Sequence, residues 1–449
     1  MASLRRRLER LWPTEAGGRL LLAYLLCAAA VWVAAGSLRG LPYALASLAV
    51  VIAAIRRPGA SSPPSPRLLT VAVALSTLGA VVRPPGAYLP PSAPLWLFAL
   101  LALVKAGHLF LAAKGRLAPR RALALVALIF VVEGGLMLHL VPAPRIDVFV
   151  LGQDAARELL DGHSPYSARF PNPYDEAETL AFYGRPLASL DGYPYPPLTL
   201  LLTTLSYLLG GDVRWLLLVA QLATGLLLFP LARRHRGDEP TALALAALPL
   251  VAPGALFVLE QAWVDPLLGL GLVASLLLLA SPRRGGIALG LTLALKQTSV
   301  LLLPLALIPR LVPRRSLAIA LTVAALVTVP FVLWDPRGFL DDVILLQLRQ
   351  PFRMDALSIA PVVAHLTGWQ APGGLSFVAA LVAGAWAARR LPAGARGFAL
   401  GAALSSFAFF IVAKQAFANY YHFVGVALLA AAATAGGEGS AAAGEVPRA

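Results

Sequence analysis

Apolar stretches of roughly 20 residues recur along nearly the whole of this chain, from Arg19–Leu38 to Phe417–Ala435. About 20 apolar residues are what a helix needs to cross a bilayer. Hydrophobic residues make up 59% of the 449 residues and charged residues 13%, a balance that would not keep a water-soluble domain of this size dissolved. The sequence therefore predicts an all-α, polytopic transmembrane protein with about 13–14 spans.

The formal net charge of +15 does not indicate a nucleic-acid partner, because its cations are scattered and do not form one basic face. They gather at the ends of the apolar stretches, as the positive-inside rule expects of cytoplasmic loops. The clusters are Arg5–Arg7, Arg56–Arg57, Lys114 with Arg120–Arg121, Arg233–Arg236, Arg283–Arg284, Arg310 with Arg314–Arg315, and Arg389–Arg390. We expect a multi-pass protein of the cell membrane with both termini in the cytoplasm.

This rule divides the chain into three parts. Residues 1–120 hold four N-terminal spans that are a possible addition to a core, residues 121–435 hold the core, and residues 436–449 form a cytoplasmic, disordered tail. The expected N-terminal spans lie near 19–38, 41–55, 68–82 and 94–113. The expected core spans are 121–142, 213–231, 241–259, 262–280, 316–334, 372–389, 397–413 and 417–435.

Residues 147–197 form the longest polar stretch, and the charge rule places this outer segment outside the cell. Val148–Leu160 has the pattern of an amphipathic helix that lies on the membrane surface. Pro196–Leu209 is too short for an untilted crossing, so we expect a half-helix there. The same argument splits 285–309 at Lys296–Gln297 into two short helices that meet at the outer face.

A second set of polar residues falls at the outer ends of the spans in this topology. Ionisable groups at membrane depth usually face a protein interior or a wet cavity, because burying them in lipid is costly. The set comprises Asp147, Glu260, Gln261, Asp265, Lys296, Gln297, Arg349, Arg353, Asp355, Lys414, Gln415, Asn419 and His422. Their convergence on one side is the main indication of function, although Arg349, Asp355 and His422 taken singly are typical of side chains that snorkel to water.

Spacing groups some of these residues further. The pairs Gln261/Asp265, Arg349/Arg353 and Gln415/Asn419 are four residues apart and Asn419/His422 three apart, so each pair would share a helix face.

Sugar transfer from a phosphate carrier needs a carboxylate to accept a proton and cations to hold the departing phosphate. Asp147 supplies the carboxylate. Lys296, Arg353 and Lys414, with Arg349 beside them, supply the cations. Tyr193 and Tyr195, in the run Tyr193–Leu198, are placed to stack on a sugar or to line a lipid entry; as a structural alternative, they anchor the chain at headgroup depth. The remaining polar residues of the set are candidates for sugar or acceptor binding: Glu260, Gln261, Asp265, Gln297, Gln415, Asn419 and His422.

These motifs resemble glycosyltransferase family 87 of the GT-C superfamily over roughly residues 125–430. The resemblance rests on Ile146–Phe149, Ala155–Ala156, Leu159–Leu160, Gly162, Pro165–Tyr166 and Tyr193–Leu198, followed by Glu260–Trp263, Lys296–Gln297 and Lys414–Tyr421. One departure is that about four spans precede Asp147 here, whereas GT-C proteins usually carry the key acid just after their first span.

The resemblance implies transfer of a hexose, commonly mannose, from a polyprenyl-phosphate donor to a lipid or glycan acceptor at the outer face, with inversion. It implies that Asp147 is the catalytic base, and it implies no metal; no other cofactor is expected. A secondary transporter or a lipid flippase is the alternative function. A transporter would show paired repeats with a site near the bilayer midplane, whereas this chain offers one long outer segment with its charges biased to one face.

Overall fold

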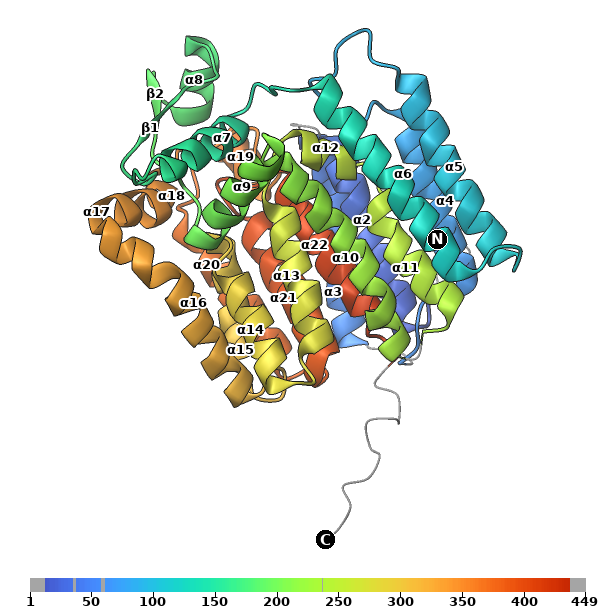
Figure 1. Ribbon diagram of the computed structural model, residues 1–449. Coiled ribbons are helices and arrows are strands. Elements are labelled where there is room, and N and C mark those ends of the chain that lie inside the picture. Colours follow the sequence, from blue (N-terminus) through green and yellow to red (C-terminus); the bar gives the residue numbers. More distant parts are fainter. Residues whose placement is uncertain (1–12, 35–37, 58–60, 236, 437–449) are drawn as a thin grey trace.

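The computed structural model describes residues 13–34, 38–57, 61–235 and 237–436. Most of these residues lie in helices that stand side by side as one bundle, with a small two-stranded sheet at one end (Figure 1). The cluster Arg5–Arg7, Arg236 and the tail from residue 437 onward lie outside the described residues. The prediction of an all-helical, polytopic membrane protein is confirmed.

Seven helices in the described ranges are long and apolar enough to cross a membrane. They are α2 (Ala16–Ala34), η1 with α3 (Leu38–Gly40 and Leu41–Arg56), α5 (Leu95–Ala113), α6 (Pro119–Leu140), α10 (Arg214–Arg234), α16 (Arg314–Trp334) and α21 (Gly394–Ile411). Seven shorter apolar helices accompany them: α4 (Pro66–Val82), α9 (Pro197–Gly210), α11 (Glu239–Val251), α13 (Asp265–Leu278), η2 with α15 (Gln297–Leu302 and Leu303–Ala306), α20 (Gly374–Ala388) and α22 (Ala418–Ala433). Proline occupies the first turn of α4, α6 and α9, where its missing N–H leaves no helical bond unmade.

The outer segment folds into more structure than its sequence predicted. Its expected amphipathic helix is α7 (Asp147–Leu160). Beyond α7, strands β1 (Arg169–Pro171) and β2 (Ser189–Asp191) pair antiparallel, with Arg169 opposite Asp191, and α8 (Glu176–Tyr183) lies between them. A capping box between Asp175 and Glu178 starts α8, because each side chain accepts a hydrogen bond from the other residue's backbone N–H.

Two breaks in the bundle bring backbone and polar side chains to its interior. The span expected over 241–259 is two helices, α11 and α12 (Ala255–Glu260), because Pro253 and Gly254 interrupt it. The break expected at Lys296–Gln297 is present: α14 (Pro282–Leu293) ends before it, and Lys296 itself is extended.

The stretch after α16 was not assigned from the sequence. It forms α17 (Pro336–Phe339), the π-helical η3 (Leu340–Leu345), α18 (Leu346–Arg349) and α19 (Ile359–Thr367).

The N-terminal helices share one hydrophobic core with the rest of the chain. Helix α2 packs along α22, and α4 packs on α11. Cys27 of α2 and Val424 of α22 both lie fully buried in the same cluster of core residues.

Candidate active site

Asp147 is the first residue of α7, where the positive end of the helix dipole favours a carboxylate. Its carboxylate accepts a hydrogen bond from the Tyr183 hydroxyl at 2.6 Å, and its backbone N–H donates to the Tyr174 hydroxyl at 3.1 Å. These three residues, here the Asp147 cluster, join the start of α7 to α8. Among the described residues, Asp147 forms no salt bridge, so its carboxylate is held by neutral donors.

The tyrosines around Asp147 stay protonated. Burial raises the pKa of the Tyr183 hydroxyl above its usual range, and the charge of Asp147 raises it further. The pKa of Tyr174 is raised for the same two reasons, with burial again the larger. Tyr183 therefore donates to the carboxylate, and does not compete with it for a proton.

Arg353 lies against α8 at Phe182, the residue before Tyr183. Its guanidinium stacks 4.4 Å from the ring centre of Phe182 and 5.0 Å from that of Phe417. It also donates two hydrogen bonds to the Asp355 carboxylate, at 2.8 and 2.7 Å. Because Phe182 precedes Tyr183, adjacent residues of α8 contact the predicted base and a predicted phosphate ligand.

Lys296 pairs with Asp265 deep in the bundle. Its ammonium donates to both Asp265 oxygens, at 2.9 and 2.8 Å, and the Asn419 side chain donates to the same carboxylate at 2.6 Å. All three side chains of this Asp265 cluster are buried. Because the chain is extended at Lys296, just before η2, this side chain reaches the start of α13. Its ammonium therefore contacts the Asp265 carboxylate instead of lipid.

Two aromatic residues lie between the Asp147 and Asp265 clusters. The Lys296 ammonium lies 4.6 Å from the ring centre of Tyr420, and both acids are close enough to act electrostatically on that tyrosine. Burial raises the pKa of Tyr195 well above its usual range, followed by the charge of Asp147 and, more weakly, that of Asp265. The predicted base and the buried ion pair thus belong to one contiguous region.

Lys414 and Gln415 hold a neighbouring segment of backbone. The Lys414 ammonium donates to the carbonyls of Leu348, at 3.0 Å, and Gln350, while Gln415 donates to the Pro351 carbonyl at 3.0 Å. The Arg353 N–H donates to the Lys414 carbonyl at 3.0 Å. Burial lowers the pKa of Lys414. Its two acceptors are uncharged, so they leave its positive charge uncompensated.

Glu260 connects the core to the N-terminal helices. Its carboxylate accepts hydrogen bonds from the backbone N–H groups of Ala87 and Tyr88, at 2.6 and 2.8 Å, and from Gln261 at 3.0 Å. The backbone of the loop between α4 and α5 therefore binds the Glu260 carboxylate, which the sequence analysis named as a candidate ligand of the sugar or acceptor.

The run from Gly192 to Tyr195 is fixed against η3. Gln297 donates to the carbonyls of Pro194 and, at 3.1 Å, Val343. Gly192 has a φ of +28°, and a Cβ there would lie 1.2 Å from an Asp342 carboxylate oxygen, so only glycine fits. Tyr193 is completely buried against Tyr166 and Tyr195, so it packs as a core residue in this conformation and not as a stacking platform.

Three of the helical pairings inferred from spacing are wrong. A turn with Ala262 at a φ of 53° separates Gln261 from Asp265. Helix α18 ends at Arg349 before Arg353, and α22 begins at Ala418 after Gln415. Asn419 and His422 do share α22.

Two further residues lie apart from Asp147. His422 lines a cavity of about 30 Å³ with Tyr24 and Pro249, which is room for one water molecule. Arg349 pairs at 2.6 Å with Asp341, where both side chains are more than half exposed.

Sequence reasoning missed Tyr174, Phe182, Tyr183 and Asp342. The capping box at Asp175 would have indicated α8, and with it the helix that carries Phe182 and Tyr183. Nothing local to residues 335–345 indicated that Asp342 is buried.

Residues 193–414 match the family model described as Glycosyltransferase family 87. Among solved structures, the chain is similar to the crystal structure of ArnT from Cupriavidus metallidurans bound to undecaprenyl phosphate, at 18% sequence identity and a TM-score of 0.43. That alignment covers 69% of this chain and 59% of ArnT. A search of curated proteins gives no match.

The family match includes Lys296, Arg353 and Lys414, together with the run from Tyr193, and it begins after Asp147. The match supports a membrane glycosyltransferase that resembles glycosyltransferase family 87.

Proposed function

We propose that the chain transfers a hexose, mannose in the first instance, from a polyprenyl-phosphate carrier to a lipid or glycan acceptor. The reaction takes place at the extracytoplasmic face of the cell membrane. The observation that carries the proposal is the state of Asp147: a half-buried carboxylate at a helix N-terminus, held by a tyrosine hydroxyl and paired with no cation among the described residues.

In this mechanism Asp147 takes the proton from the acceptor hydroxyl. The hydroxyl oxygen forms a bond to the anomeric carbon as the bond from that carbon to the phosphate oxygen breaks. The electron pair leaves with polyprenyl phosphate, and attack opposite the leaving group inverts the anomeric centre. Tyr183 orients the carboxylate so that one oxygen remains directed at the acceptor.

The leaving phosphate gains negative charge that cations must hold. Lys414 suits this task best, because only neutral carbonyls bind its ammonium. Arg353 suits it if a phosphate replaces Asp355, whose side chain is 41% exposed, as the partner of the planar guanidinium. Lys296 suits it less, because Asp265 already neutralises its charge. We therefore assign Lys296 and Asp265 a structural role beside the site, and not a role in binding the phosphate.

The test is transfer of labelled mannose from a synthetic polyprenyl-phosphate mannose by the purified protein in lipid nanodiscs. Asp147→Asn keeps the shape of the side chain and removes the base, so we expect turnover to fall about 10²- to 10⁴-fold. Asp154→Asn is the matched control on the same helix, since Asp154 pairs only with Arg157 at the surface. Equal turnover in Asp147→Asn and the wild type would exclude this base.

The same assay separates the enzyme from a transporter or flippase. A flippase would move the labelled lipid between leaflets of a proteoliposome without forming a glycosylated product. Lipid movement without product in the wild type would replace the proposed transferase with that alternative.

A further inference from the structure

A hollow of about 460 Å³ opens between α6 and α10 at the end of the bundle opposite the Asp147 cluster. The C-terminal end of α6 and the N-terminal end of α10 lie beside the outer segment, where Arg214 donates to the Val141 carbonyl at 2.8 Å. Arg120 begins α6 and Arg233 ends α10, so both lie at the far end. The volume falls within the roughly 300–1,000 Å³ of ordinary ligand sites.

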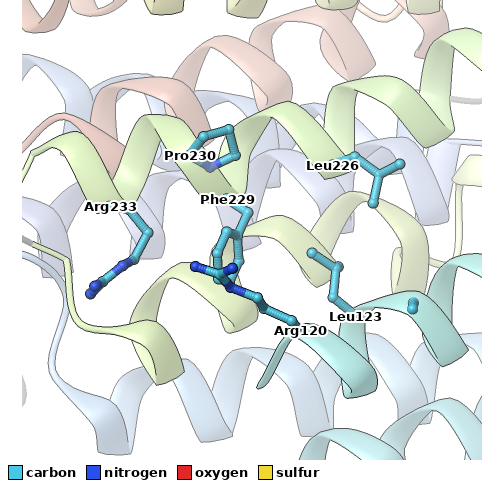
Figure 2. A pocket seen from close by; sticks show the side chains of 7 residues that line it. Arg120, Leu123, Leu226, Phe229, Pro230 and Arg233 are labelled. Carbon is cyan, nitrogen blue, oxygen red and sulfur yellow. The ribbon is translucent and has the colours of Figure 1, made fainter. Parts of the chain in front are cut away.

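The walls of this hollow divide by polarity. Figure 2 shows the guanidinium groups of Arg120 and Arg233 toward one end and the apolar side chains of Leu123 and Leu226 toward the other. Phe229 lies between them. Leu226 is 39% exposed although it sits on a membrane-spanning helix, so the apolar part faces the surroundings of the bundle.

The charge at the polar end is positive. Arg120 and Arg233 line this end, and the acids beside it in sequence and space are Glu239, 3.6 Å from Arg120, and Asp238. Asp238 is engaged in capping α11 through the Thr241 N–H at 2.7 Å. Glu239 pairs with Arg120, whereas Arg233 donates to the Gly237 carbonyl and forms no ion pair among the described residues, so the mouth of the apolar hollow keeps a positive charge.

We propose that this hollow binds one anionic phospholipid of the membrane. The phosphate lies between Arg120 and Arg233, which offer planar donors to its oxygens, and the first carbons of an acyl chain lie against Leu123, Leu226 and Phe229. A soluble anion would use the arginines and leave the apolar wall empty. A basic pocket between spanning helices at the cytoplasmic side is a typical site for anionic lipid headgroups.

Ala124 provides a way to close the hollow without changing its charge. It lines the hollow and is exposed, so a larger side chain there enters the space a lipid chain would occupy. The variant Ala124→Trp therefore tests the apolar contact, and Arg120→Gln with Arg233→Gln tests the polar one.

The experiment measures binding of dioleoyl-phosphatidylglycerol to the purified, delipidated full chain in detergent by native mass spectrometry. Dioleoyl-phosphatidylcholine and inorganic phosphate are the comparison probes. We expect phosphatidylglycerol to bind the wild type. R120Q/R233Q and A124W should each weaken this binding at least about tenfold, which is the size of effect expected from losing roughly one charged hydrogen bond. R314Q/R315Q, which removes two exposed arginines at the start of α16, should bind as the wild type does.

Three results would overturn the proposal: unchanged affinity in R120Q/R233Q or in A124W, equal binding of phosphatidylcholine, or an equal loss in R314Q/R315Q. Displacement of the lipid by millimolar inorganic phosphate would also overturn it, because that would make the site a simple anion site. The readout does not involve sugar transfer, so it stands apart from the proposed activity.

Discussion

The Asp147 and Asp265 clusters lie in one region of the molecule, yet their acids are balanced in opposite ways. Both carboxylate oxygens of Asp265 accept hydrogen bonds from the Lys296 ammonium, and one also accepts from the Asn419 amide. All three side chains are buried. The Asp147 carboxylate accepts a hydrogen bond from a tyrosine hydroxyl and is half-buried at the start of α7. A carboxylate within the bilayer needs an opposite charge to be stable, whereas one at the surface can be oriented by neutral donors and remain free to accept a proton.

Among substitutions that test this contrast, loss of the buried Lys296–Asp265 pair should have the largest effect on stability. Asp265→Asn leaves Lys296 as an uncompensated buried cation, so we expect a loss of about 3–5 kcal/mol in the free energy of unfolding. Thermal unfolding in detergent measures it, and Asp265→Asn/Lys296→Met should recover part of the loss. An Asp265→Asn protein with native stability and no transfer activity would instead place Asp265 in the chemistry.

Asp342 is a third case, a buried acid that pairs with no cation among the described residues and accepts a hydrogen bond from the Tyr193 backbone N–H. Burial raises its pKa to about 7, with further contributions from Asp191, Asp341 and Asp335. A folded-state pKa above the unfolded one means that the folded chain holds a proton the unfolded chain releases. This stabilisation is complete at acid pH and is lost as pH rises through 7, by about 2–3 kcal/mol between pH 5 and 8.

The measurement compares unfolding of the wild type and Asp342→Asn at both pH values. The substitution should remove most of this pH dependence. Asp161→Asn, at an exposed aspartate that does not act on Asp342, is the control. An unchanged pH dependence in Asp342→Asn would show that another group titrates.

Tyr183→Phe removes one hydrogen bond to the Asp147 carboxylate. Such a bond to a charged group is worth about 1.5–3 kcal/mol, so we expect turnover to fall roughly 10- to 100-fold with little change in the KM for donor. Tyr174→Phe, which leaves the carboxylate oxygens untouched, should have a smaller effect. Equal effects of the two substitutions would mean that α8 acts only by packing.

The smallest expected effect is at Arg349. Its pair with Asp341 is exposed, and such pairs contribute about 0–1 kcal/mol. Arg349→Gln should therefore leave both transfer and unfolding near the wild type. A large loss of transfer would return Arg349 to the phosphate site.

Much of the bundle could be predicted from composition and charge, because both the length of a span and the position of its basic ends are properties of a short stretch. The break at Lys296 was predictable for the same reason. The helical pairings failed where a turn, as at Ala262, or an extended residue, as at Gln350, interrupts the helix between the two partners.

The partners of the acids could not be predicted. Lys296 and Asp265 are 31 residues apart and Asp147 and Tyr183 are 36 apart, and no local pattern says which side chains a bundle will bring together. The sequence analysis assigned Lys296 and Asp265 to separate tasks, phosphate binding and sugar binding, whereas packing joins them as an ion pair.

The bond network of Glu260 bears on how the protein could be shortened. Removing residues 1–120 would take away the two backbone amides that solvate this carboxylate and would open α22 where α2 covers it. A Glu260 carboxylate left buried without these donors would cost more folding free energy than most single substitutions do. A trimmed version should therefore begin upstream of α2, and a library of truncations would find its folded members among those that keep the loop at Ala87.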